Sequence, residues 1–186
     1  MIDFNPSIYG PIAADLLTPE RLPELGPGTP NLAVNPKLQA LSVELLFPEG
    51  TRDADMARCC IGALWLWHDY LDEAHQIVQD IDRPEGSYWH GIMHRREGDY
   101  DNAKYWFRRT GEHPVFDLVQ SEMSKALQQT DDGGTPGRNR VASALAFVDL
   151  CAAAIGKKNS LETYCQRIQQ VEWQFLFHGC WKRATR

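Results

Sequence analysis

A 29-residue repeat in the middle of the chain limits what this sequence can fold into. Five pairs of residues with similar side chains stand 29 positions apart: Gly62 and Gly91, Leu71 and Tyr100, Asp72 and Asp101, Ala74 and Ala103, and Val78 and Phe107. Each unit carries a glycine and, twelve positions later, an alanine. Such small residues let two helices approach closely. A proline ends each unit, at Pro84 and at Pro114. The repeat predicts two helix hairpins within residues 56–114.

The spacing of apolar residues predicts helices along the rest of the chain. Between residues 56 and 67 these residues recur three and four positions apart, as Met56, Cys59, Cys60, Ala63, Leu64 and Trp67. The same period continues over 71–81 and stops at the turn sequence of 83–86. Helical spacing also predicts helices between Asn35 and Phe47 and over 87–97, 101–110, 115–129, 141–155 and 160–183. No segment alternates as a strand does, so we predict a single all-α domain of about seven helices.

The chain has the size of one domain with an arm. Its length of 186 residues is typical of one domain. Seven of the 11 prolines lie in residues 1–36, which predicts an N-terminal arm packed over a helical body. The turn-rich segment 131–137 predicts an internal loop, followed by C-terminal helices over 141–183. The last of these helices is apolar on most sides and is therefore expected to be buried against the hairpins.

Composition excludes several classes of partner. With 19 Lys and Arg against 25 Asp and Glu, the net charge of -6 argues against a protein that binds nucleic acid. No run of 18 apolar residues predicts a membrane span, and the first residues lack the pattern of a signal peptide. Five cysteines without paired spacing predict reduced thiols, mostly in the core. We therefore expect a cytoplasmic protein.

The second repeat unit resembles a tetratricopeptide repeat. Gly91, Gly98, Tyr100, Ala103 and Phe107 occupy the consensus spacings of that motif, and Pro114 closes the unit. The period of 29 differs from the usual period of about 34. His90 and His94 also occupy positions that are apolar in the consensus. The resemblance implies helix-hairpin architecture and no particular activity.

Four strings resemble a family of uncharacterised bacterial proteins. They are WHDYLDEAH at 67–75, YWHGIMHRRE at 88–97, NAKYWFRR at 102–109 and QQVEWQFLF at 169–177. The resemblance implies a shared fold around a divergent tetratricopeptide-like helical core. It assigns no reaction and no catalytic residue.

Histidines concentrate in the repeated segment. Five of the six lie between residues 68 and 113. His90 and His94 stand four positions apart, which places both rings on one helix face in the spacing of a metal site. His75 or Glu73 would supply a third ligand for a transition metal such as zinc. The same three histidines could serve an acid/base enzyme, and the structural alternative is that they bond to neighbouring carboxylates in the core.

Arginines and aromatic residues of the same segment predict an anion site. Adjacent guanidinium groups can bind a carboxylate or phosphate, and flat aromatic side chains can form the walls of a pocket. The residues expected to contact the ligand are Tyr88, Trp89, His90, His94, Arg95, Arg96, Arg108 and Arg109. The alternative is an ion-paired structural face. We predict a binding or scaffold module that recognises an anionic small molecule or peptide, ahead of an enzyme.

Overall fold

The computed structural model describes residues 4–129 and 144–185, without the side chains of 122–129. Its elements are, in order, η1 (Pro6–Tyr9), α1 (Gly10–Leu16), η2 (Leu32–Val34), α2 (Asn35–Gln39), α3 (Val43–Leu46), α4 (Ala54–Trp67), α5 (Leu71–Val78), α6 (Pro84–Glu97), α7 (Tyr100–Thr110), α8 (Pro114–Gln129), α9 (Ala144–Ala154) and α10 (Ser160–Thr185). Within these ranges no strand occurs, so the all-α prediction is confirmed. The predicted loop at 131–137 lies outside the described residues.

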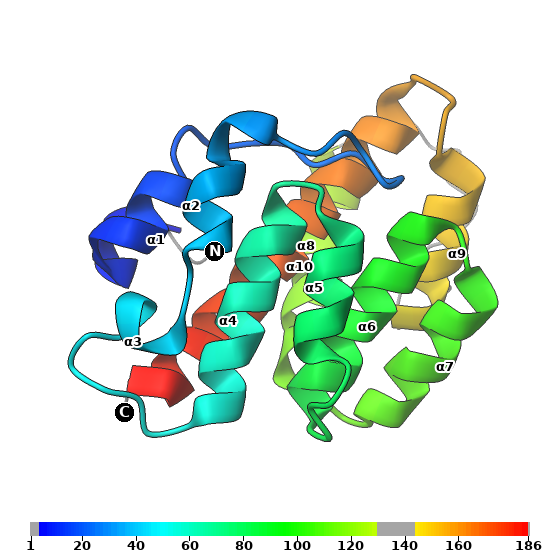
Figure 1. Cartoon of the computed structure of the whole chain (residues 1–186). Coiled ribbons are helices and arrows are strands. Elements are labelled where there is room, and N and C mark those ends of the chain that lie inside the picture. Colours follow the sequence, from blue (N-terminus) through cyan, green and yellow to red (C-terminus); the bar gives the residue numbers. More distant parts are fainter. Residues whose placement is uncertain (1–3, 130–143, 186) are drawn as a thin grey trace.

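The described residues form ten α-helices rather than about seven. The additional helices are short and lie in the N-terminal third (Figure 1). The single helix expected between Asn35 and Phe47 is divided into α2 and α3, because Ser42 is extended and its side chain accepts a hydrogen bond from Leu45 N at 3.2 Å. A serine in that role begins a new helix. In the described part of the chain, no helix is both long and apolar enough to cross a membrane.

The repeat forms two helix hairpins, α4 with α5 and α6 with α7, that lie side by side (Figure 1). In the first hairpin, a side chain at Gly62 would approach Val78 Cγ1 to 2.6 Å. In the second, a side chain at Gly91 would approach the ring of Phe107 to 2.7 Å. Val78 and Phe107 are themselves 29 positions apart. Both units therefore use the same close contact between a glycine in the first helix and an apolar residue in the second.

The turns of the two hairpins differ. The second uses Gly98 at φ +85°, a glycine that ends α6 in the usual left-handed conformation. The first uses Asp69 at φ +67°, which is uncommon for any residue other than glycine. This turn interrupts the apolar period that runs from residue 56 to 81. The Asp69 carboxylate at this turn pairs with Arg21 and Arg96.

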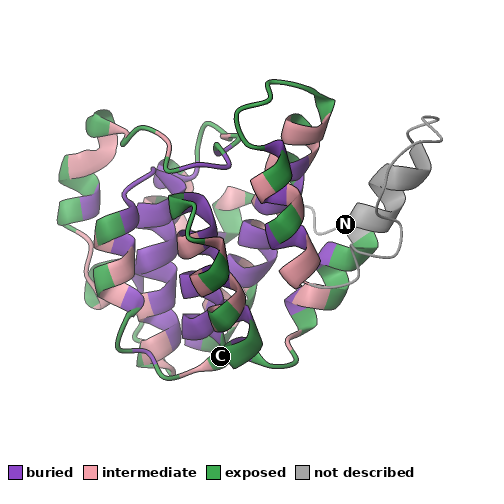
Figure 2. Ribbon diagram, turned by 90° about the vertical axis from the view of Figure 1, so that its right-hand side faces the viewer, coloured by how far each residue is buried: buried purple, intermediate pink, exposed green. Residues whose placement is uncertain are grey.

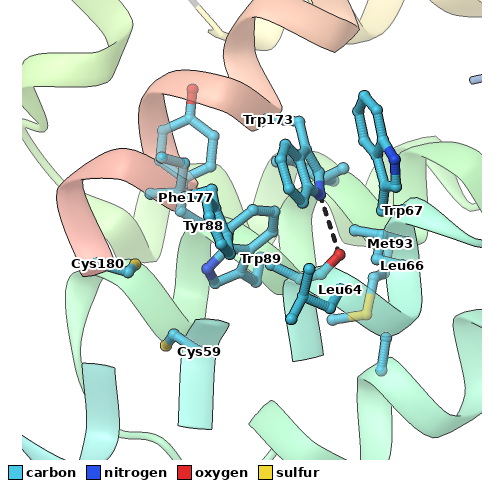
Figure 3. Packing of buried hydrophobic residues seen from close by; sticks show 14 of the residues in the cluster. Cys59, Leu64, Leu66, Trp67, Tyr88, Trp89, Met93, Trp173, Phe177 and Cys180 are labelled. Carbon is cyan, nitrogen blue, oxygen red and sulfur yellow. Dashed lines mark hydrogen bonds between the residues drawn. The ribbon is translucent and has the colours of Figure 1, made fainter. Parts of the chain in front are cut away.

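The 26-residue helix α10 packs behind the hairpins, in contact with α4, α8 and α9 (Figure 1), and buried residues run along it from Cys165 to Ala184. Figure 2 shows the buried positions gathered on the inner sides of the helices. Trp173 lies at its centre, 4.5 Å from Trp67 and 6.1 Å from Trp89 between ring centroids. Its indole N–H donates a hydrogen bond to Ala63 O at 3.1 Å (Figure 3). A buried indole N–H usually finds such an acceptor. Trp65, Trp67 and Trp89 of the hairpins and Trp173 of α10 thus belong to one core.

The N-terminal arm crosses the C-terminal ends of α4 and α6 and the first half of α10. Gln169 Nε2 donates to Glu24 O at 2.9 Å, and Gln170 Nε2 donates to Arg21 O at 2.7 Å. Asn31 N donates to His68 O at 3.1 Å. This segment has little regular structure, so its backbone N–H and C=O groups find hydrogen-bond partners in the helical body. Buried backbone polar groups need such partners.

Candidate functional site

Arg95, predicted to bind a ligand, lies in the core. Its Nη2 is 2.5 Å from Glu172 Oε2 on α10, and the two side chains are 0% and 1% exposed. Tyr88 completes this group, since its hydroxyl donates to Glu172 Oε1 at 3.0 Å. Burial raises the pKa of Tyr88, so the phenol stays protonated and remains a donor. The guanidinium also lies 4.6 Å from the ring centroid of Phe147. This arginine neutralises a buried carboxylate instead of facing solvent.

Arg96 is equally buried and joins the arm to the first hairpin turn. Its Nη2 lies 2.5 Å from Asp69 Oδ1, and its other donors reach Gly26 O at 3.0 Å and Leu66 O at 3.0 Å. The second oxygen of Asp69 accepts from Arg21 of the arm at 2.7 Å. Asp69 thus binds two arginines from different segments.

These positions correct the predicted anion surface. Tyr88, Trp89, Arg95 and Arg96 are all buried, so they cannot contact a ligand at the surface. Helix α6 is covered on nearly all sides, and the acidic partners of its arginines are distant in the sequence. Local spacing could not reveal those partners.

The two remaining arginines lie on the outside of α7. Arg109 pairs with Asp82 at 2.8 Å and lies over the ring of Trp106 at 5.4 Å. Arg108 is exposed and has no ion pair among the described residues. The predicted residues are therefore divided between the core and one helix face, and they do not converge on a shared site.

The three histidines of the predicted metal site do come together. Ring centroids lie 4.8 Å apart for His75 and His90, 5.5 Å for His75 and His94, and 6.3 Å for His90 and His94. His90 is buried and stacks on Trp106 at 4.2 Å.

Three of the six ring nitrogens in this cluster form hydrogen bonds with protein groups. His90 Nδ1 bonds Gly86 O at 2.9 Å, while His94 bonds Glu97 at 2.8 Å through Nδ1 and Asn102 at 3.2 Å through Nε2. Across the described residues, no group of three or more His, Cys, Asp or Glu side chains is placed to hold a metal ion. The metal prediction is corrected accordingly: the rings are neighbours, but within the described residues they do not form a group that could hold a metal ion.

The buried position of His90 predicts that stability depends on pH. Burial, followed by the nearby His75, His94 and Arg109, lowers the pKa of His90 to about 4. The unfolded chain, with a histidine pKa of about 6.5, then binds more protons between these two values. The contribution of the neutral His90 ring to the free energy of unfolding is therefore fully present above pH ~6.5. It falls as the pH drops toward 4, and at pH ~4.5 the free energy of unfolding is lower by about 2.5 kcal/mol.

Urea unfolding at both pH values measures this effect. The variant His90→Gln has no titrating ring, so its loss of stability between neutral pH and pH ~4.5 should be smaller than that of the wild type by about 2.5 kcal/mol. An equal loss in both proteins would show that His90 is not the group responsible.

Comparison with protein-family models, with curated proteins and with solved structures gave no match. Function is therefore inferred from the geometry of the chain itself.

A groove of about 680 Å³ lies where the two ends of the chain meet. We call it the terminal groove, and it is lined by Ile8, Tyr9, Gly10, Pro11, Ile12, Leu45, Leu46, Phe47, Pro48, Glu49, Gly50, Thr51, Arg52, Trp181 and Thr185. These residues belong to η1 and α1, to α3 with the loop after it, and to the end of α10. Figure 1 shows these elements at one end of the molecule, beside the C-terminus.

Aromatic packing and main-chain bonds hold the three segments of the groove together. The ring of Trp181 lies 5.4 Å from that of Tyr9 and 4.6 Å from that of Phe47. Ala184 O accepts hydrogen bonds from Arg52 N and from Thr51 Oγ1, both at 2.9 Å. The walls are therefore built by the fold and do not depend on a ligand for their position.

The terminal groove is partly open, and its surface is slightly more apolar than polar. Ile8 is 55% exposed and Leu45 is 44% exposed, although both are large aliphatic residues. The charged lining residues are Glu49 and Arg52, both exposed. The sequence did not indicate this site, because its three segments, 8–12, 45–52 and 181–185, are far apart in the chain and none of them carries a recognisable motif. The basic last turn of α10 was the one local signal, and it is equally typical of a helix end.

Proposed function

We propose that this chain is a binding protein that holds a small, largely apolar molecule in the terminal groove. The observation that carries the proposal is a preformed groove of about 680 Å³ with exposed aliphatic residues at its opening. Ligand sites commonly have volumes of about 300–1,000 Å³ and a mainly apolar lining with a few polar groups. Large exposed apolar side chains that gather around such a groove are typical of an interaction site.

The helix hairpins would act as the rigid support of this site. We propose that they are a divergent tetratricopeptide-like pair, because the contacts of Gly62 with Val78 and of Gly91 with Phe107 are equivalent. Flanking helices then complete the stack, as repeats require. Five free and buried cysteines support a cytoplasmic location.

Binding of the uncharged dye Nile red tests the proposed function. Wild-type protein should bind the dye saturably, with an increase in fluorescence. Ile8→Trp places a larger side chain in the groove at a position that is already exposed, and it should weaken binding at least about tenfold because the apolar contacts are blocked.

The matched control is Leu118→Trp, which replaces another exposed aliphatic residue on α8. This variant should bind the dye as the wild type does. Equal affinity in the wild type and in Ile8→Trp, or no saturable binding by the wild type, would contradict the proposed function.

A further inference from the structure

We infer that the ligand of the terminal groove is an amphipathic molecule with one anionic end, an aliphatic carboxylate, and that Arg52 binds this end. The inference rests on the proposed function and adds the chemical class of the ligand. It also moves the anion site that the sequence suggested from α6 and α7 to a residue of the loop between α3 and α4.

The main chain at Arg52 is firmly held. Its N–H donates to Ala184 O at 2.9 Å, and the preceding Thr51 hydroxyl donates to the same oxygen. The following residue, Asp53, begins α4 by accepting from Met56 N at 3.2 Å. The Cα of Arg52 is thus fixed between the end of α10 and the start of α4.

The Arg52 side chain is nevertheless exposed and has no hydrogen bond or ion pair with any described residue. This contrasts with Arg95 and Arg96, whose guanidinium groups are occupied by buried carboxylates. A guanidinium on a fixed backbone presents parallel donors that match a carboxylate. Arg52 therefore has the chemistry and the freedom to bind an external anion.

The lining of the terminal groove carries one cation and one anion, Arg52 and Glu49. Arg183, in the last turn of α10, is compensated by Glu85 and Asp53. Lys182 in the same turn has no partner among the described residues. Within the lining itself, Arg52 and Glu49 balance one another, so the terminal groove is not acidic although the whole chain carries a net charge of -6.

The rest of the lining suits an aliphatic chain. Ile8, Ile12 and Leu45 supply branched apolar surface, and Pro11 and Pro48 have no backbone N–H to satisfy. Removing a chain of methylene groups from water against such a surface is favourable. A ligand whose apolar chain lies along this surface and whose carboxylate binds Arg52 would contact both the aliphatic side chains and the guanidinium of the groove.

Three eight-carbon probes test the inference: octanoate, 1-octanol and octylammonium, titrated calorimetrically at low salt. Octanoate should bind the wild type about tenfold more tightly than 1-octanol, since a charge-assisted pair adds to the same apolar contacts. Arg52→Gln should remove this difference and leave the binding of 1-octanol unchanged. Glu49→Gln should strengthen octanoate binding about threefold, because it removes a nearby negative charge.

Arg108→Gln is the matched control, since it removes another exposed and unpaired arginine far from the groove in the sequence. It should leave octanoate binding unchanged. Equal affinity of octanoate and 1-octanol for the wild type overturns the inference. The inference is also overturned if octylammonium binds the wild type most tightly of the three probes and loses this binding in Glu49→Gln. If 1-octanol still binds and Ile8→Trp blocks it, the proposed function stands. If none of the three probes binds the wild type, both the inference and the proposed function are overturned.

Discussion

Replacing Glu172 with glutamine is expected to lower the free energy of unfolding by about 3–5 kcal/mol, because it leaves the Arg95 guanidinium as an unpaired charge in the core. The two side chains are almost completely inaccessible, and the pair lies 2.5 Å apart. Arg95 cannot reduce this cost by losing its proton, since guanidinium groups stay charged in proteins. Burial disfavours the charged form, but the Glu172 carboxylate more than compensates and raises the pKa of Arg95. Urea unfolding of the wild type and of Glu172→Gln measures the difference.

The double variant Arg95→Met with Glu172→Leu separates the cost of an unpaired charge from the value of the pair. It removes both charges and fills similar volume, so it should be more stable than Glu172→Gln alone. Asp149→Asn is the surface control: Lys104 and Asp149 also lie 2.5 Å apart, but Asp149 is 66% exposed. This substitution should cost less than about 1 kcal/mol. If the double variant is the least stable of the three, the buried pair is itself strongly stabilising and the prediction is wrong.

Asp69→Asn should be similarly destabilising, by about 3–5 kcal/mol, and should also loosen the N-terminal arm. Asp69 binds Arg96 from α6 and Arg21 from the arm, at 2.5 Å and 2.7 Å. Asparagine tolerates the positive φ of this turn about as well as aspartate does. The substitution therefore removes the charge with little effect on the backbone.

Hydrogen exchange distinguishes this effect from general destabilisation. Amides of residues 20–31 should exchange faster in Asp69→Asn, in excess of the change across α4 and α10, because the arm loses an attachment that the helices retain. Asp82→Asn, which breaks the exposed pair with Arg109, should leave the arm unchanged. A uniform increase in exchange over the whole chain in Asp69→Asn would show that the carboxylate stabilises the body and not the arm in particular.

The helices and their hairpin pairing could be predicted because the relevant signals are local. The apolar period of residues 56–67 places Met56, Cys59 and Cys60 on one buried face, and all three are buried. The equivalence of Gly62 and Gly91 predicts a close approach in both hairpins, and each glycine meets the expected second helix. Helical period and residue size act over a few turns of chain, so both are visible in the sequence.

The candidate site could not be predicted in the same way. His90 and His94 have the spacing of metal ligands, yet Gly86, Glu97 and Asn102 occupy three of their four ring nitrogens. Arg95 and Arg96 look like part of a cationic surface until Glu172 and Asp69 are placed beside them. Residue type and spacing specify what a side chain can bind, but the fold decides which partner reaches it.

The sequence by itself determined that this chain is helical, that two similar hairpins stand at its centre, and that its tryptophans and cysteines belong mainly to a core. Only the tertiary structure decided which charges are buried and which are exposed. Arg52 forms no ion pair with an acidic side chain of the described residues, whereas Arg95 meets a carboxylate 77 residues away. Hydrophobic period is a property of neighbouring residues, but ion pairing and the shape of a groove depend on segments that meet only after folding.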